Sequence, residues 1–304
     1  MSDLFEGKMF DVEHALNIYA RDFVTIPAFS IYDDAALDSL RSQIESCHIY
    51  LIGRVPRVDV LDVISLGNFC TIKLQCERKV FWQRWPLPAG ASLEINSEGG
   101  WCIRDRNGRA SFPHESEIHR RLNREHRVAN FEVLYIGQAY GDNGSRNALD
   151  RLRKHETLQK ISVTGAAGPD CNLTVLMLGI EPANRLITHF NPLAEVKTKG
   201  SERIAMGLDK LFGTSEAERT TLYEASLIRY FQPKFNKIFK DNFPSTDLKT
   251  LRDCYDKDFA ALVAEISIDS LPFLLHSEVV PPNADHIAKH DLHAAAERRM
   301  FFML

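Results

Sequence analysis

The spacing of apolar residues predicts an alternation of helices and strands along the chain. Residues 11–46 carry apolar side chains at near-helical intervals and are predicted to be helical. The apolar run HIYLIG at 48–53, bounded by Gly53 and Pro56, is typical of a strand. Between about 54 and 112, short β-prone pieces alternate with turn residues, which predicts a small β-rich module.

The middle of the chain has the clearest periodicity. Helix follows strand twice, and the second strand is a continuous apolar run of the kind found at the centre of a sheet. Pro233 is expected to stop the last helix. The predicted elements are a helix over 116–127, a strand over 131–137, a helix over 147–161, a central strand over 171–180 and a helix over 215–231.

The last part of the chain, 247–304, is predicted to be a mostly helical extension. Its pattern indicates a helix, the apolar run LPFLL, a break at Pro281-Pro282 and a terminal helix from about Asp285. Two glycine-containing loops, GDNG at 141–144 and TGAAGPD at 164–170, lack the lysine and hydroxyl pattern of a phosphate-binding loop, so both are predicted to be turns.

Length and composition narrow the class of protein. A chain of 304 residues fits one or two domains, and 26% charged with 44% hydrophobic residues is typical of a soluble globular protein. No apolar run reaches the ~20 residues that span a bilayer, and the acidic start does not resemble a secretory signal. The expected location is therefore the cytoplasm, without membrane association. The six cysteines form no CxxC pair and indicate neither a zinc site nor a disulfide framework.

Charge is distributed unevenly around a net value of -4. Residues 1–46 hold nine acidic against three basic side chains, whereas three later segments, at 118–127, 146–160 and 229–240, are basic. Each segment alone is typical of a solvated helix face, but three together favour a phosphate-binding surface. The candidate nucleic-acid-binding residues are Arg120, Arg121, Arg124, Arg127, Arg153, Lys154, Lys234 and Lys237.

Four polar features occur in an order that suggests chemistry. Tyr135 begins a Tyr-Ile-Gly run at a strand end, Arg151 and His155 are spaced i and i+4 in the next predicted helix, and Glu224 and Asn236 follow. Each feature alone has a structural explanation: a strand meeting a turn, an exposed helix face, or an acid favoured by the helix dipole. Their order is what indicates a common site.

This order resembles the GIY-YIG nucleases. The later motif of that family is a glutamate, an apolar residue four positions on, a proline and an asparagine, and Glu224, Ile228, Pro233 and Asn236 fit it position by position. The family's first motif normally lies a short hairpin before YIG. Here the nearest candidate is Tyr50 in HIYLIG, which makes 54–130 an insertion between two paired strands. A tyrosine on a buried strand is also often only a packing residue.

The resemblance implies a fold and a set of roles. The expected fold is α/β (α+β), a small mixed sheet flanked by helices, made of 47–53 plus 131–240, with a helical segment at 1–46, the insertion at 54–130 and an extension at 241–304. Tyr50 and Tyr135 would line the catalytic pocket, one of them as general base, and Asn236 would orient the end of the glutamate helix.

The residue types suit phosphodiester hydrolysis. Glu224 offers a hard oxygen to Mg²⁺ or Mn²⁺, Arg151 a planar fork to the scissile phosphate with Arg153 as its nearest rival, and His155 a proton affinity near working pH. The predicted function is therefore metal-dependent cleavage of DNA, in restriction, phage defence or repair. RNA is left open as a substrate, and the oligomeric state stays open.

The alternative prediction is a catalytically silent relative that binds nucleic acid or other protein subunits within a larger assembly. The missing local GIY strand and the acidic first 46 residues favour it. Binding of Mg²⁺ through Glu224 would distinguish the nuclease, because a silent scaffold should bind DNA equally well with a chelator present.

Overall fold

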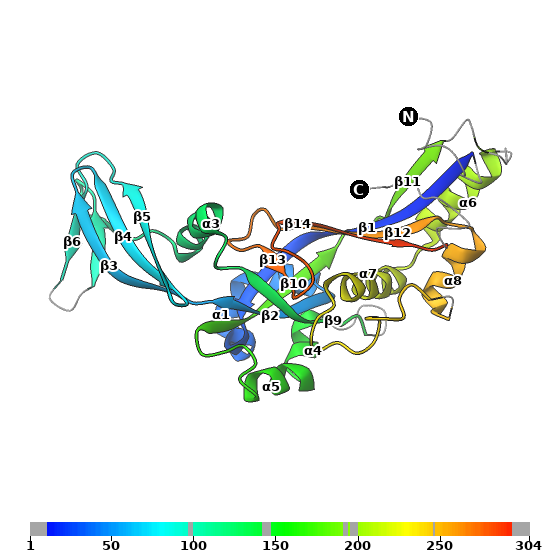
Figure 1. The fold of residues 1–304 in the computed structure, drawn as a ribbon, viewed down its shortest axis with the longest axis horizontal. Coiled ribbons are helices and arrows are strands. Elements are labelled where there is room, and N and C mark those ends of the chain that lie inside the picture. The colour runs from blue at the N-terminus through cyan, green and yellow to red at the C-terminus, as the bar shows by residue number, and fades with distance from the viewer. Residues whose placement is uncertain are drawn as a thin grey trace.

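A mixed β-sheet with helices on its faces forms the centre of the molecule (Figure 1). The computed structural model describes residues 11–96, 100–141, 147–190, 194, 200–245 and 247–293. Within these residues the sheet has eight strands in the order β13-β9-β2-β10-β1-β12-β14, with β11 paired to β1. The strands are β1 (Val12–Pro27), β2 (Ile49–Pro56), β9 (Phe131–Gln138), β10 (Cys171–Ile180), β11 (Arg185–Phe190), β12 (Ala261–Ser267), β13 (Leu275–His276) and β14 (Asp285–Asp291).

The strands predicted at 48–53, 131–137 and 171–180 are confirmed as β2, β9 and β10. Strand β10 lies between β2 and β1, the central position that its continuous apolar run predicts. It pairs antiparallel with both neighbours. Strand β2 pairs antiparallel with β9 across the long insertion, with Ile52 opposite Tyr135. The mixed α and β class is therefore confirmed.

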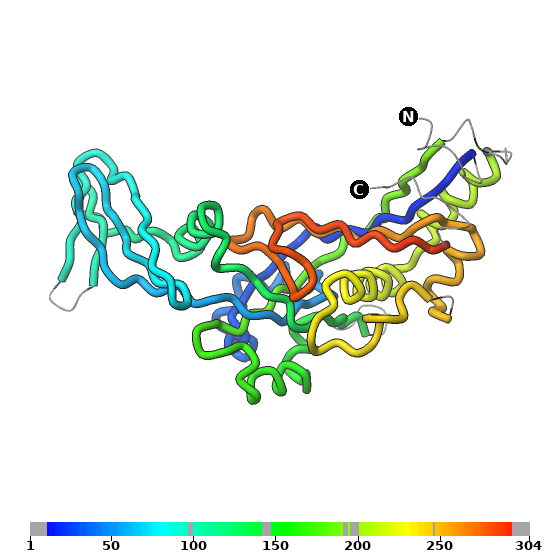
Figure 2. The backbone as a smooth tube through the Cα atoms, in the orientation of Figure 1, coloured from blue at the N-terminus to red at the C-terminus, as the bar shows by residue number. Residues whose placement is uncertain are grey.

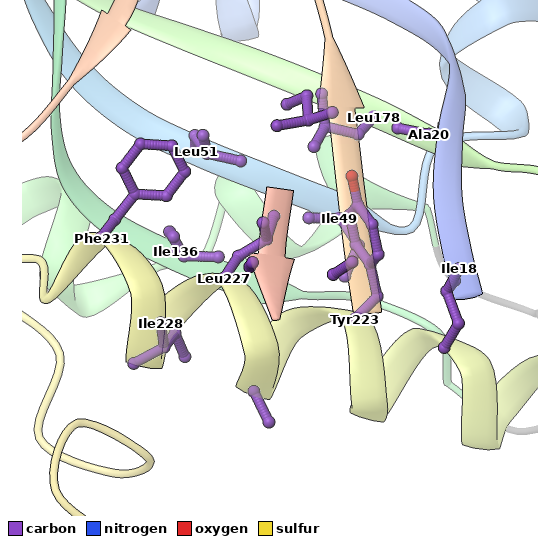
Figure 3. Close-up of a cluster of buried hydrophobic side chains, with 14 of the residues drawn as sticks. Ile18, Ala20, Ile49, Leu51, Ile136, Leu178, Tyr223, Leu227, Ile228 and Phe231 are labelled. Carbon is purple, nitrogen blue, oxygen red and sulfur yellow. The ribbon is translucent and has the colours of Figure 1, made fainter. Parts of the chain in front are cut away.

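Helix α7 (Glu216–Phe231) packs lengthwise against the sheet and confirms the helix predicted there. The Ser215 side chain caps its first turn, and Gln232 ends it in the left-handed conformation just before Pro233. Tyr223, Leu227 and Phe231 point from α7 into the strands (Figure 3), where they are fully buried. Burying such side chains stabilises the fold by roughly 1.5–3 kcal/mol each.

The insertion forms its own module at one end of the molecule (Figure 2). One sheet has the order β3-β4-β5, another has β6-β7-β8, and helix α3 packs its Ile118 and Leu122 against them. The β-rich module and the basic helix predicted at 116–127 are both confirmed. Their bounds are β3 (Val58–Leu66), β4 (Phe69–Cys76), β5 (Lys79–Pro86), β6 (Ser92–Ile95), β7 (Trp101–Arg104), β8 (Ala110–Ser111) and α3 (Glu115–His126).

Short helices connect the remaining strands. They are η1 (Ala28–Tyr32), α1 (Asp34–Leu37), η2 (Asp38–Leu40), α2 (Arg41–Glu45), α4 (Ala148–Leu152), α5 (Glu156–Val163), α6 (Gly200–Gly213) and α8 (Lys249–Asp256). Among the described residues, no helix is long and apolar enough to cross a membrane. The predicted turn at 141–144 falls mostly outside the described residues.

The prediction of a helical segment at 1–46 is wrong for residues 12–27, which form the long strand β1. Polar side chains in VEHALN mimic one face of a helix, yet they are buried in the sheet and paired. Asn17 donates a hydrogen bond to Glu265 at 2.6 Å, and the His14 ring is bonded to Thr188 at 3.0 Å. Among the described residues of this segment, helices occur only within 28–45, and all of them are short; residues 1–10 lie outside the described residues.

The predicted terminal helix from Asp285 is wrong for residues 285–291, which form strand β14, while residues 294–304 lie outside the described residues. His286, Ala288 and His290 alternate toward the core. The ring Nε2 atoms of His286 and His290 are bonded to the backbone oxygens of Leu275 and Ser226 at 3.1 Å each. The extension therefore completes the central sheet.

Candidate active site

The pairing of β2 with β9 brings Tyr50 and Tyr135 together. Their rings are 6.3 Å apart between centroids, and Tyr50 lies directly opposite Gly137 in the ladder. A Cβ at Gly137 would lie 2.5 Å from the Tyr50 hydroxyl oxygen and 2.9 Å from the Tyr135 ring. The glycine of the Tyr-Ile-Gly run is therefore required to make room for the tyrosine pair.

The two tyrosines differ in their surroundings. Burial raises the pKa of both phenols. The charge of Tyr135 adds to the increase for Tyr50, and the charge of Glu224 adds to the increase for Tyr135. Tyr50 is 1% exposed, whereas Tyr135 is half-buried. Tyr50 is hydrogen-bonded to the Tyr135 hydroxyl, a contact that acts to lower the pKa of Tyr135. The deprotonated form is therefore better supported at Tyr135.

Arg151 lies at the end of α4 and reaches this tyrosine pair. Asn147 and Asp150 form a capping box that fixes the start of α4. The Arg151 guanidinium is hydrogen-bonded to the Tyr50 hydroxyl, and its charge lowers the pKa of both tyrosines. Because Arg151 is exposed, the rest of its fork is open to an anionic ligand.

His155 completes the group from a different helix. The predicted helix over 147–161 is broken: α4 ends at Leu152, and His155 is the N-cap of α5, its Nδ1 accepting the Leu158 backbone N–H at 3.2 Å. The His155 ring lies 5.5 Å from that of Tyr50 and 5.0 Å from that of Tyr135. Arg151 and His155 thus meet by a turn between two short helices.

The expectation that His155 titrates near working pH is wrong. Burial, with a further contribution from the Arg151 charge, lowers the pKa of His155 to about 4. The imidazole is therefore neutral at neutral pH. With Nδ1 accepting a backbone hydrogen bond, its proton resides on Nε2, so the ring is arranged as a donor and not as a base.

Glu224 approaches the same place from the interior of α7. Its carboxylate accepts hydrogen bonds from the backbone and side chain of Gln138, the last residue of β9. Burial nevertheless raises the pKa of Glu224 to about 8, against the smaller opposing effects of Gln138 and of the Arg151 charge. A buried carboxyl next to a cation and two phenols is an unusual arrangement that costs stability.

Asn236 holds the loop after α7 against the Tyr-Ile-Gly strand. Its side chain accepts the Ile136 backbone N–H at 2.9 Å and donates to the Ile136 carbonyl at 2.8 Å. The backbone N–H of Phe235 adds a bond of 3.0 Å to the Leu134 carbonyl. Asn236 is therefore a clamp between the loop and β9, on the strand that carries Tyr135.

An open cavity of about 320 Å³ lies beside this group. Sequence analysis did not identify Gln138 or Tyr140, which line it from the end of β9 together with Arg151 and Thr221. Their only sequence signal was their position directly after the Tyr-Ile-Gly run. Tyr140 donates a hydrogen bond to Glu216 at 3.1 Å, which fixes the wall of the cavity.

The other basic candidates lie at varying distances from this site. Arg153 is held by Asp34 at 2.6 Å and by the Ile31 carbonyl at 2.8 Å, so α4 is anchored by it while Lys154 stays exposed. Lys234 and Lys237 are exposed in the loop after α7. On α3, Arg120, Arg124 and Arg127 line a second cavity of about 300 Å³, and the Arg121 guanidinium stacks on Trp85 at 3.6 Å.

The donor set fits one kind of metal. Among the described residues, no three histidine, cysteine or acidic side chains gather in a group that could enclose an ion. Mg²⁺ needs no such group, because it keeps several waters and binds through one or two carboxylates plus phosphate oxygens. The hydrogen bonds from Gln138 and the charge of Arg151 do not offset the burial of the Glu224 carboxyl, so the site fits a cation such as Mg²⁺ or Mn²⁺.

In comparisons with protein-family models, with curated proteins and with solved structures, nothing matched this chain.

Proposed function

We propose that this protein is a divalent-metal-dependent endonuclease that hydrolyses DNA phosphodiester bonds on a GIY-YIG-like core. The observation that carries the proposal is the convergence of Tyr50, Tyr135, Arg151, His155 and Glu224 from two strands, a helix end, a helix cap and a helix interior. The ring centroids of Tyr50, Tyr135 and His155 lie within 6.3 Å of one another. The charges of Arg151 and Glu224 act on the pKa of both phenols.

Arg151 binds the scissile phosphate in this mechanism. Its guanidinium is permanently charged and exposed, and a bond to Tyr50 fixes its orientation. A fixed fork offers two parallel hydrogen bonds to phosphate oxygens and neutralises the charge that grows on them in the transition state.

Tyr135 is the preferred general base. Its hydroxyl is the more accessible of the pair and accepts the hydrogen bond from Tyr50. To act as the base, Tyr135 would first lose its own phenolic proton. The phenolate would then take a proton from a neighbouring water as that water attacks the phosphorus, while the bond between phosphorus and the 3′ oxygen breaks and the leaving oxygen takes a proton from solvent. Tyr50 and the neutral His155 then act as positioning residues, because their contacts hold the Tyr135 ring and the Arg151 fork in place.

Glu224 is the residue that would hold Mg²⁺ or Mn²⁺. When bound, the metal supplies charge for the phosphate and for the leaving 3′ oxygen. Gln138 donates two hydrogen bonds to the carboxyl and orients it, and Asn236 fixes the strand from which Gln138 comes. DNA would be gripped further along by Lys154, Lys234, Lys237 and the arginines of α3.

Glu224→Gln tests the proposal. The substitution keeps the shape and removes the charge, so we expect Mg²⁺-dependent cleavage of plasmid DNA to fall by at least about 100-fold. Glu156→Gln, an exposed acid on α5, is the matched control and should cut at the wild-type rate. Undiminished cleavage by a folded Glu224→Gln protein would overturn the assignment.

A catalytically silent nucleic-acid-binding or scaffold subunit is the second candidate. The raised pKa values of Glu224 and both tyrosines favour it, because without a cation the group is largely uncharged at neutral pH except for Arg151. Such a subunit would bind DNA with equal affinity in Mg²⁺ and in chelator, and neither the wild type nor Glu224→Gln would cut.

A further inference from the structure

Helix α6 presents two charged residues to the core and a row of apolar residues outward. Arg203, Gly207 and Lys210, at helical spacing, are buried against the sheet and neighbouring helices. Ile204, Leu208 and Phe212, also at helical spacing, are 36%, 42% and 82% exposed. Surface helices normally have the opposite arrangement, with the apolar row buried.

The inward orientation is fixed by specific contacts. Arg203 is 2.9 Å from Asp258 and 3.4 Å from Glu13, and it also donates to the Val12 carbonyl at 2.6 Å. Lys210 is 1% exposed and lies 3.0 Å from Asp253, with a second ion pair to Glu218. Rotating the helix to bury its apolar row would break both sets of ion pairs, including the buried pair of Arg203 with Glu13.

Gly207 fixes the same orientation by shape. A Cβ at this position would lie 2.9 Å from His14 Nε2 and 3.0 Å from Leu186 Cδ2, so only glycine lets α6 lie this close to β1 and β11. The ion pairs and Gly207 therefore fix the rotation of α6 that leaves the apolar row exposed. We call Ile204, Leu208, Leu211 and Phe212 the outer row.

We propose that the outer row of α6 is the contact surface of a homodimer, packed against the same row of a second copy. Figure 1 places α6 beside β11 at the end of the molecule opposite the inserted module. There it is accessible to another subunit. This inference does not depend on nuclease activity.

The chemistry of the row favours a second copy over DNA or a charged partner. Among the charged residues of α6, Arg203 and Lys210 are paired inward and Asp209 is paired with Lys257 at 2.7 Å, so the outer row itself carries no charge. The partner surface must then be uncharged and apolar, and an antiparallel copy of the row meets that requirement under two-fold symmetry. Ala205 at the edge of the row allows close approach of two helices.

The size of the surface is also adequate. A two-fold axis brings together two outer rows, and Phe190, 61% exposed at the end of the neighbouring β11, can extend the contact. Large apolar side chains from both copies then approach the roughly 1,000 Å² of buried surface that a specific interface needs. Strand β11 pairs only with β1 among the described strands, so its second edge adds hydrogen-bonding groups next to the row.

Sedimentation velocity of the full chain tests the proposal. Over about 1–100 µM protein we expect the wild type to sediment as a dimer that dissociates on dilution. Leu208→Glu places a charge in the centre of the row and should weaken self-association at least about tenfold. Val163→Glu is the matched control, because Val163 is 87% exposed on α5, away from the row, and should dimerise like the wild type.

Circular dichroism and melting temperature verify that each variant is folded, and Phe212→Ser provides a second disruption of the row without a charge. A wild-type protein that stays monomeric throughout this range would overturn the proposal. So would a dimer that persists in Leu208→Glu and Phe212→Ser.

Discussion

Single residues explain why the site is built from this sequence. Gly137 was part of the Tyr-Ile-Gly pattern, and its structural reason is the Tyr50 ring that lies against it. The order of Tyr135, Arg151, His155, Glu224 and Asn236 could be read from the sequence alone. Gln138 could not be found that way, since its role depends on where α7 places Glu224 against the end of β9.

We predict that Gly137→Ala destabilises the protein by about 2–4 kcal/mol, because a Cβ would overlap the Tyr50 hydroxyl. Urea unfolding measures the loss. Gly213→Ala, where nothing lies within 4 Å, should cost almost nothing. Equal losses of stability in Gly137→Ala and Gly213→Ala would contradict the close approach of the Tyr50 ring.

Glu224 is predicted to lower the stability of the fold in the absence of metal. Its folded pKa of about 8 exceeds the ordinary value of 4.5, so the native state binds the proton more tightly and stability falls as pH rises from about 4.5 to 8. Glu224→Gln should therefore be more stable than the wild type at pH 8, by about 2 kcal/mol. Thermal melts at pH 5 and pH 8 measure the difference, which should be small at pH 5.

At the scale of elements, strands made of continuous apolar runs were predicted correctly, whereas strands that contain buried polar residues were not. The run at 171–180 is apolar throughout, and its length and position predicted the central strand β10. Strands β1 and β14 carry buried Glu13, His14 and His290, whose partners lie on α6 and α7. Local periodicity contains no information about such distant partners, so both strands were predicted to be helices.

The buried His290 in β14 predicts a loss of stability in acid. Burial lowers its pKa from 6.5 to about 4, so the unfolded chain takes up the proton first and stability falls as pH drops from 6.5 toward 4. Between pH 7 and pH 5 this residue should account for about 1–2 kcal/mol. His290→Gln keeps a donor for the Ser226 carbonyl, and its unfolding free energy should change less over this range. If chemical denaturation shows that the unfolding free energy of His290→Gln depends on pH as strongly as that of the wild type, the assignment is contradicted.

At the scale of the whole molecule, the α6 surface and the proposed nuclease site lie on different parts of the same sheet (Figure 1). If both proposals hold, a dimer carries two sites and can cut both strands of a duplex in one encounter. Leu208→Glu should then convert supercoiled plasmid mainly to nicked circles, whereas the wild type should produce linear DNA early. Gel analysis of the first products distinguishes the two. If the wild type and Leu208→Glu gave equal proportions of linear DNA, cleavage of both strands would not depend on dimerisation.

The architecture as a whole was only partly predictable. The insertion between β2 and β9 was predicted from the distance between the two tyrosine-bearing runs, and these strands do pair, with Tyr50 opposite Gly137. That β12 joins the same sheet was not predicted, because it pairs with β1 across more than 200 residues of sequence, and β14 joins the sheet through β12.

The parallel pairing of β1 with β12 has a consequence for synthesis of the protein. Ala15 faces Ala261, so the first strand made waits for one of the last before its ladder can close. Pairing between strands so distant in sequence slows folding. A growing chain on the ribosome, or a fragment that ends before residue 261, would carry its tyrosines, arginine and glutamate on a sheet that still lacks β12, β13 and β14. The synthesis of β14 is thus the earliest moment at which a finished sheet can stand behind them.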